Sequence, residues 1–384
     1  QPEDDSFILS AYKTLQAVFP VVEVFAVNDP DSYQIQNIMF FVSNQELEKP
    51  FKTLLLNNEK LAKKARYLVD MSPYMLNNQV RYTDNYAPVE RHTSKLLQKR
   101  PVKNSPSTKF NGKNAYDFVR AQVALGPRAL GTGGHQRVQK LIIDELKQSG
   151  IAVSLQTWNE SDSDNESYEF TNILGRLNPD KTDRILLGTH YDSKMFADQD
   201  SVDPTAPVPG ANDSASGVAV LLELARVMER NSVGVDFVFF DGEEGFPNMK
   251  EGEWRPIGSQ HFVSERSEFY PMTDPKFVGV VDMVCDKDLK IYAEESSLKY
   301  GGAVYRDFLE HAVSAYPSYF TSKVKYHIRD DHTPFGEAGI PAFVIIDYDY
   351  PAFHTREDTL DKCSASSLQV VGTTLESFVK LQNK

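Results

Sequence analysis

From about residue 114 onward, the chain alternates between apolar runs of strand length and amphipathic runs of helix length. The stretch 135–150 repeats aliphatic residues at helical spacing and stops at Gly150, which is typical of a helix that ends at a glycine. Helical spacing recurs at 216–230 and 301–316. The apolar runs predict strands at 152–158, 171–177, 184–190, 236–241, 277–284 and 342–349. Because continuous apolar strands between helices indicate a sheet covered on both faces, we predict an α/β fold with a central, mostly parallel sheet flanked by helices.

The first ninety residues have a different pattern and predict a small, separate α/β segment. Residues 7–20 have helical spacing that Pro20 ends, and 21–27 and 36–43 predict two strands around a turn-rich stretch. Residues 91–113 combine prolines with serines, threonines and basic residues, which is typical of a solvated linker. We therefore expect an accessory segment at 1–90, a linker at 91–113 and the main domain at 114–384.

The accessory segment, which closes with the stretch TDNYAPVER, resembles the final part of an aminopropyltransferase-like nucleotide-binding domain. The glycine-rich turn that such a domain uses to bind its cofactor is absent from this segment. We therefore predict no methyl- or aminopropyl-transfer activity and expect an accessory or remnant domain.

The overall composition argues against several classes of partner. The formal net charge of −13 disfavours nucleic acid and anionic membrane as main partners, because both are polyanions. No run approaches the roughly 18–20 apolar residues of a membrane helix, so no membrane insertion is expected. The chain begins at Gln1 without the pattern of a signal peptide. The two cysteines, Cys285 and Cys363, make neither a disulfide framework nor a cysteine-based zinc site, and they leave the redox compartment open.

Histidines and acidic residues follow the predicted strands at their carboxyl ends, which is where α/β sheets bind ligands. The potential ligands are His190, Asp213, Glu244, Asp282 and His354, with Glu243 beside them. Each residue alone has a simpler explanation, such as a turn, a helix cap or a solvated loop. Their coincidence at four strand ends predicts one metal site. Imidazoles and carboxylates without thiolates suit zinc at a catalytic site, where an open position takes water or substrate.

The two adjacent glutamates are expected to have different roles. Neighbouring side chains on an irregular loop point apart, so Glu244 can bind the metal while Glu243 faces the open position. A carboxylate at that position acts as general base and then as general acid. The alternative is that Glu243 only orients a ligand. Asp192 is expected to support the imidazole of His190.

Six stretches occur in the order HYDS, GANDSASG, FFDGEE, GSQHF, VVDM and FHTREDT. In this order they resemble the motifs of the zinc aminopeptidase and glutaminyl cyclase superfamily, over roughly residues 114–384. The resemblance implies a central mixed sheet, a zinc-dependent catalytic domain and peptide or protein N-termini as substrates. It also implies an extracytoplasmic location, either periplasmic or secreted.

Two branches of this superfamily imply different sites. The aminopeptidase branch uses two zinc ions bridged by Asp213, with Glu244 and one histidine on the first ion and Asp282 and the other histidine on the second. Its Glu243 would activate the water that cleaves off an N-terminal residue.

The glutaminyl cyclase branch uses one zinc ion, held by Asp213, Glu244 and His354. The zinc polarises the side-chain amide of an N-terminal glutamine, whose own α-amine attacks it, so that pyroglutamate forms and ammonia leaves. The resemblance makes Glu243 the proton shuttle, places Asp282 beside the base and the amine, and assigns Asp330 to the hydrogen-bond network.

Finer features favour the cyclase branch. The stretches QVALGPRALGT, HYDSKMFADQD, EGEW and RDDHTPF resemble bacterial-type glutaminyl cyclases, as does the insertion that bears Trp254. Cyclases commonly have Trp before the last zinc histidine, whereas this chain has Phe353, an aromatic residue that can still line a small pocket. We expect Trp254, Phe353 and His332 around the substrate pocket, with Tyr348 and Tyr350 either lining or covering it. The aminopeptidase remains the alternative, and a non-catalytic metal-binding relic is the third hypothesis.

Overall fold

The computed structural model describes residues 21–26, 38–43, 68–69, 108–229, 233–247, 249 and 252–382. The chain divides into two compact units at the boundary between residues 101 and 102. Within the first unit, β1 (Val21–Ala26) pairs antiparallel with β2 (Ile38–Ser43) and with β3 (Leu68–Val69). The strands predicted at 21–27 and 36–43 are therefore confirmed. The helix predicted at 7–20, the stretch TDNYAPVER and most of the linker at 91–113 lie outside the described residues.

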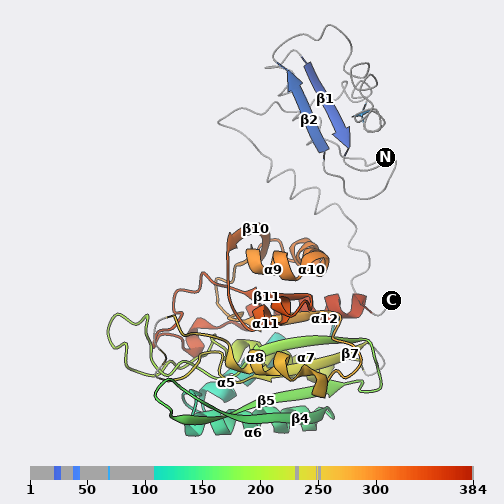
Figure 1. Ribbon diagram of the computed structural model, residues 1–384. Coiled ribbons are helices and arrows are strands. Elements are labelled where there is room, and N and C mark those ends of the chain that lie inside the picture. The colour runs from blue at the N-terminus through green and yellow to red at the C-terminus, as the bar shows by residue number, and fades with distance from the viewer. Residues whose placement is uncertain are drawn as a thin grey trace. The chain divides into compact units, whose positions relative to one another are not determined.

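The second unit is built on a mixed six-stranded sheet with the order β11-β8-β6-β7-β5-β4. Figure 1 labels the strands β11, β7, β5 and β4 of this sheet. The pairs β11–β8, β8–β6 and β6–β7 are parallel, whereas β7–β5 and β5–β4 are antiparallel. The strands are β4 (Ala152–Ser161), β5 (Ser167–Leu177), β6 (Arg184–His190), β7 (Gly234–Phe240), β8 (Val278–Asp282) and β11 (Ala342–Ile346). All six correspond to predicted strands, and the predicted α/β fold class is confirmed.

Helices cover both faces of this sheet. The first face is covered by α5 (Gly112–Val123), α6 (Gly133–Gln148), α7 (Ala215–Val227), α10 (Gly302–Ala315) and α12 (Ala365–Leu381). The second face is covered by α8 (Ile257–Ser264) and α11 (His332–Glu337). The helices predicted at 135–150, 216–230 and 301–316 correspond to α6, α7 and α10.

Alternation along the strands explains why both faces are apolar. In β6, Ile185 and Leu187 join the core cluster on the first face, while Leu186 joins the cluster on the second. In β11, Phe343 belongs to the cluster on the first face and Val344 to the cluster on the second. Because successive side chains of a strand point to opposite faces, a strand covered on both sides needs a continuous apolar run. That run is the pattern from which the strands were predicted.

A smaller part of the second unit was not predicted from the sequence. The strands β9 (Ile291–Glu294) and β10 (Phe320–Tyr326) form a parallel pair beside α9 (Glu295–Tyr300). Single 3₁₀ turns lie at η3 (Arg266–Glu268) and η4 (Leu360–Lys362). Most of β10 is exposed or half-buried, so it lacks the apolar run of a core strand.

The start of the second unit is packed before residue 114. Phe110 belongs to the core cluster of the first face, and its backbone N–H donates to Glu376 of α12 at 2.8 Å. Among the described residues, no helix has the length and apolarity that a membrane crossing requires.

Candidate metal centre and its cavity

The predicted ligands lie at one edge of the sheet, where its parallel strands end. His190 is the last residue of β6 and Asp282 is the last residue of β8. Asp213 lies just before Ser214, the N-cap of α7, and Glu244 lies in the turn that follows β7. His354 lies in the loop after β11. Because parallel strands end at the same edge, residues far apart in sequence meet there.

Three of these residues form what we call the outer ligand group: Asp213, Glu244 and His354. One ligand atom of each lies within 4.8 Å of the others. His354 Nε2 is 3.4 Å from Glu244 Oε2 and 3.6 Å from Asp213 Oδ2. The His354 side chain is 15% exposed, so this group reaches the surface of a cavity.

Asp213 is shared with a second, inner ligand group: His190, Asp213 and Asp282. Their ligand atoms also lie within 4.8 Å of one another. His190 Nε2 is 3.2 Å from Asp213 Oδ1 and 3.3 Å from Asp282 Oδ1. The His190 side chain is only 1% exposed, and these carboxylates, together with Asp192, raise its pKa well above the ordinary value although burial opposes this.

Asp192 lies beside residues of both groups. Its Oδ1 lies 3.4 Å from His190 Nδ1. The backbone N–H groups of Glu243 and Glu244 donate to its two carboxylate oxygens at 3.2 and 3.0 Å. This carboxylate therefore holds the turn after β7 through two hydrogen bonds and lies at ion-pair distance from the imidazole at the end of β6.

The turn after β7 depends on a glycine. Gly242 has φ of +71°, in the left-handed region that L side chains rarely adopt. A Cβ built at this position would lie 2.5 Å from the Phe170 ring. The turn presents Glu243 and Glu244 next to each other at the carboxyl end of the strand.

Residues that the sequence analysis did not single out complete the outer group. Lys194 Nζ lies 3.1 Å from Glu244 Oε2, and Asp198 Oδ1 lies 3.0 Å from His354 Nδ1. Asp358 accepts the backbone N–H groups of Asn212 at 2.8 Å and Asp213 at 3.1 Å. Lys194 and Asp358 lie within stretches quoted for the resemblance, but nothing in their spacing indicates these partners.

The charges of the outer group shift its pKa values in opposite directions. Burial and the Glu244 carboxylate raise the pKa of Asp213 to about 7. Burial alone would raise the pKa of Glu244, but Lys194 and His354 hold it below the ordinary value. Burial opposes protonation of His354, yet Glu244 and Asp198 raise its pKa to about 10. Because only neutral imidazole binds metal, ion binding by this group displaces a proton.

The outer group fits zinc by two observations. It offers one imidazole nitrogen and carboxylate oxygens, a donor set that zinc accepts at catalytic sites. In addition, Glu244 Oε1 is buried and has no hydrogen-bond partner among the residues that the structure describes. A buried carboxylate oxygen without a partner is costly unless a cation binds it.

A cavity of about 530 Å³ opens on the outer group. Its wall includes Glu243 and the two carboxylates predicted to act with it, Asp282 and Asp330. Burial raises the pKa of Glu243 well above its ordinary value, and it raises the pKa of Asp330 in the same way. Protonatable groups held close to an open metal position can exchange protons with a bound molecule.

Aromatic side chains line the same cavity. Phe353 stacks on the His354 ring with centroids 3.7 Å apart, and Tyr348 lies 5.8 Å from Phe353. Trp254 donates its indole N–H to the backbone carbonyl of Glu243 at 2.9 Å. Trp254 and Phe353 therefore line the same cavity as Glu243, and their contact with a substrate stays a prediction.

The structure places two other predicted residues elsewhere. His332 is 0% exposed and absent from the cavity wall, and its Nε2 lies 2.7 Å from the Ser296 hydroxyl. The expectation that it borders the substrate pocket is corrected, because α11 turns this ring into the core beside α9. Tyr350 is also buried, and its hydroxyl donates to Asp358 at 2.8 Å.

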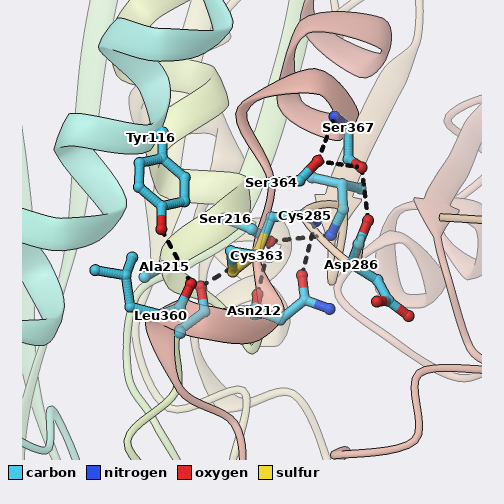
Figure 2. Close-up of a disulfide and its surroundings, with 12 residues drawn as sticks. Tyr116, Asn212, Ala215, Ser216, Cys285, Asp286, Leu360, Cys363, Ser364 and Ser367 are labelled. Carbon is cyan, nitrogen blue, oxygen red and sulfur yellow. Dashed lines mark hydrogen bonds between the residues drawn. A yellow bond between two sulfur atoms is a disulfide. The ribbon is translucent and has the colours of Figure 1, made fainter. Parts of the chain in front are cut away.

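Two loops of the centre are covalently joined. Cys285 lies in the loop after Asp282, and Cys363 lies downstream of His354; they form a disulfide buried beside α7 and α12 (Figure 2). From the sequence we expected neither a disulfide framework nor a cysteine-based zinc site, and this single disulfide was not predicted.

The mixed sheet, the ligands at its carboxyl edge and the adjacent glutamate define the class: an enzyme of the zinc exopeptidase and glutaminyl cyclase superfamily. The chain belongs to peptidase family M28, whose sequence pattern matches residues 172–379.

Individual relatives agree with this assignment. The chain is 26% identical over 297 residues to a glutaminyl-peptide cyclotransferase of Drosophila melanogaster, covering 69% of this chain and 79% of that protein. It is similar to the crystal structure of Tannerella forsythia glutaminyl cyclase, with 31% identity, a TM-score of 0.66 and coverage of 71% and 99%. A Zn-dependent exopeptidase from Parabacteroides distasonis has 29% identity, a TM-score of 0.66 and coverage of 71% and 99%.

Proposed function

We propose that this protein is a zinc-dependent glutaminyl-peptide cyclotransferase, which converts N-terminal glutamine into pyroglutamate and releases ammonia. The observation that carries the proposal is the outer ligand group opening on a cavity that Glu243 also lines. Relatives named as glutaminyl cyclases, from an insect and a bacterium, support the choice of reaction.

Asp213, Glu244 and His354 would hold the zinc ion. A zinc ion bound there would polarise the carbonyl of the glutamine side-chain amide and make its carbon more electrophilic. The nucleophile belongs to the substrate itself, so the protein has only to orient the two ends and move protons.

The residues of the chain account for those protons. The substrate α-amine forms a bond to the amide carbon while the bond from that carbon to the amide nitrogen breaks. Glu243 accepts a proton from the attacking amine and delivers it to the departing nitrogen, which leaves as ammonia. A raised pKa suits Glu243 to both steps, because the group has to gain and lose the proton with similar ease. Asp282 would bind the amine, and Asp330 would keep the carboxylates hydrogen-bonded to one another.

The aromatic wall would accept the glutamine side chain. Phe353 and Tyr348 form one side of the cavity and Trp254 lies in the same lining. Flat apolar surfaces around the methylene groups exclude water from the reacting amide and strengthen the polar contacts at its end.

A specific observation favours one alternative, a two-zinc aminopeptidase. The inner ligand group shares Asp213 with the outer group, as a bridging carboxylate would require. In that case Glu243 would activate a water molecule for hydrolysis of the first peptide bond.

Incubation of the zinc-loaded protein with Gln-initiated peptides and with aminoacyl-anilides separates the candidates. We expect ring closure with release of ammonia and no free amino acid. Release of amino acids with two bound zinc ions would establish the aminopeptidase. Bound zinc with neither product would indicate a non-catalytic relic.

We also propose that the protein works outside the cytoplasm, in the periplasm or after secretion. The Cys285–Cys363 disulfide supports this location, because disulfides persist mainly in oxidising compartments. Peptide and protein N-termini would be its partners, and residues 1–90 would be an accessory segment joined by the linker at 91–113.

A further inference from the structure

The disulfide lies between the two loops that carry site residues from different strands. Cys285 and Cys363 are 0% and 2% exposed. Cys285 belongs to the loop that begins at Asp282, and Cys363 belongs to the segment that begins at His354. The covalent bond therefore connects the inner ligand group to the outer one.

Backbone hydrogen bonds run across the same junction (Figure 2). The Ser364 N–H donates to the Cys285 carbonyl at 2.7 Å. The Cys285 N–H donates to the Asn212 side chain at 2.8 Å, and Asn212 immediately precedes the shared ligand Asp213. The junction thus brings together all three loops from which Asp213, Asp282 and His354 come.

Both joined loops contain a residue with unfavourable backbone torsion. Met283 has φ of +46° and His354 has φ of +53°, although neither is glycine. Non-glycine residues in this region cost free energy and persist only where the surrounding structure holds them. These two residues stand directly after Asp282 and at the ligand His354 itself.

We propose that the Cys285–Cys363 disulfide is a positioning cross-link that fixes the His354 loop against the loop after Asp282 and so keeps His354 in its metal-binding arrangement with Asp213 and Glu244. This inference rests on the proposed zinc site. Removing the bond lets the His354 loop relax toward ordinary torsion angles, so the outer group loses its preformed geometry before any ion arrives.

A purely structural cross-link would behave differently. A disulfide stabilises a protein mainly by restricting the unfolded chain. Removing a purely structural disulfide would therefore lower the Tm of the metal-free form and of the zinc-loaded form by similar amounts. A positioning cross-link also changes the affinity for zinc, so the Tm difference between the two forms shrinks. Zinc affinity therefore separates the two roles.

The test is the double variant C285A/C363A, which leaves no free thiol to bind zinc. We expect zinc affinity, measured for the metal alone by chelator competition, to fall about 10- to 100-fold, the range found when groups that orient metal ligands are lost. The gain in Tm on adding zinc should fall with it. The control is Ile142→Ala on α6, which opens the same core cluster away from the site loops. This control should lower both Tm values and leave zinc affinity within about twofold of the wild type.

Zinc affinity of C285A/C363A equal to that of the control would overturn the proposal. Should the double variant fail to fold, native mass spectrometry of the wild type after partial phosphine reduction and alkylation of the freed thiols with iodoacetamide compares reduced and oxidised molecules in one sample. At limiting zinc, we expect lower occupancy in the reduced molecules, and equal occupancy contradicts the cross-link role. A wild-type protein that binds no zinc at all refutes the proposed metal site as well.

Discussion

The outer and inner ligand groups share Asp213 and the same kinds of ligand, yet their surroundings differ. His354 of the outer group faces a cavity, while His190 of the inner group is buried among carboxylates. Among the described residues, each group contains a buried polar atom without a hydrogen-bond partner, Glu244 Oε1 in the outer group and His190 Nδ1 in the inner group. Similar ligand types therefore do not make equivalent sites, because a bound substrate can reach an ion only where the ligands face a cavity.

The largest expected effect is at the outer group. In His354→Ala, zinc content should fall from one ion per chain to almost none, and turnover should be lost with it, because two carboxylates remain without their imidazole partner. Metal analysis of the purified variant checks this. Full zinc content in His354→Ala would remove the outer group as the site.

Glu243 lies beside the outer group and should affect proton transfer alone. In Glu243→Gln we expect kcat to fall by about 10²- to 10⁴-fold, the usual contribution of a positioned acid–base group. Zinc content should stay at the wild-type level, because Glu244 and not Glu243 belongs to the outer group. Loss of zinc in this variant would make Glu243 a ligand.

A variant of the inner ligand group should keep its zinc ion, in contrast to His354→Ala of the outer group. In His190→Gln we expect zinc stoichiometry to stay at one, while kcat/KM falls by about 10- to 100-fold because Asp213 and Asp282 lose the group that orients them. Metal analysis and steady-state kinetics on Gln-initiated peptides measure the two effects. A wild type with two zinc ions, one of which disappears in His190→Gln, would favour the aminopeptidase.

The smallest effect is expected at the cavity wall. Trp254→Phe keeps the aromatic surface and removes one hydrogen bond to the Glu243 carbonyl. A single hydrogen bond contributes about 0.5–1.5 kcal/mol, so kcat/KM should fall by roughly 2- to 10-fold. Zinc affinity should be unchanged. A loss as large as that of Glu243→Gln would mean that the indole acts on the reaction directly.

The local pattern of apolar residues was sufficient to predict most helices and strands of the second unit. Buried strands such as β6 and β7 have apolar side chains on both faces, so their positions can be predicted from the chain alone. The strand β10 has no such run because most of it is exposed or half-buried, and it was missed. The antiparallel pairing of β5 with β7 was also not predicted, because strand direction depends on the path of the connecting chain.

The site shows the same division. Because parallel strands end at one edge of a sheet, the pattern of apolar runs was enough to predict that the imidazoles and carboxylates after β6, β7, β8 and β11 gather there. Packing between the elements sets which of these residues have ligand atoms within 4.8 Å of one another, pairs Lys194 with Glu244 and turns His332 into the core. It also brings Cys285 and Cys363 together. The physical reason is that periodicity records which face of an element is buried, whereas partners across loops are set by packing between elements, which leaves no repeat in the sequence.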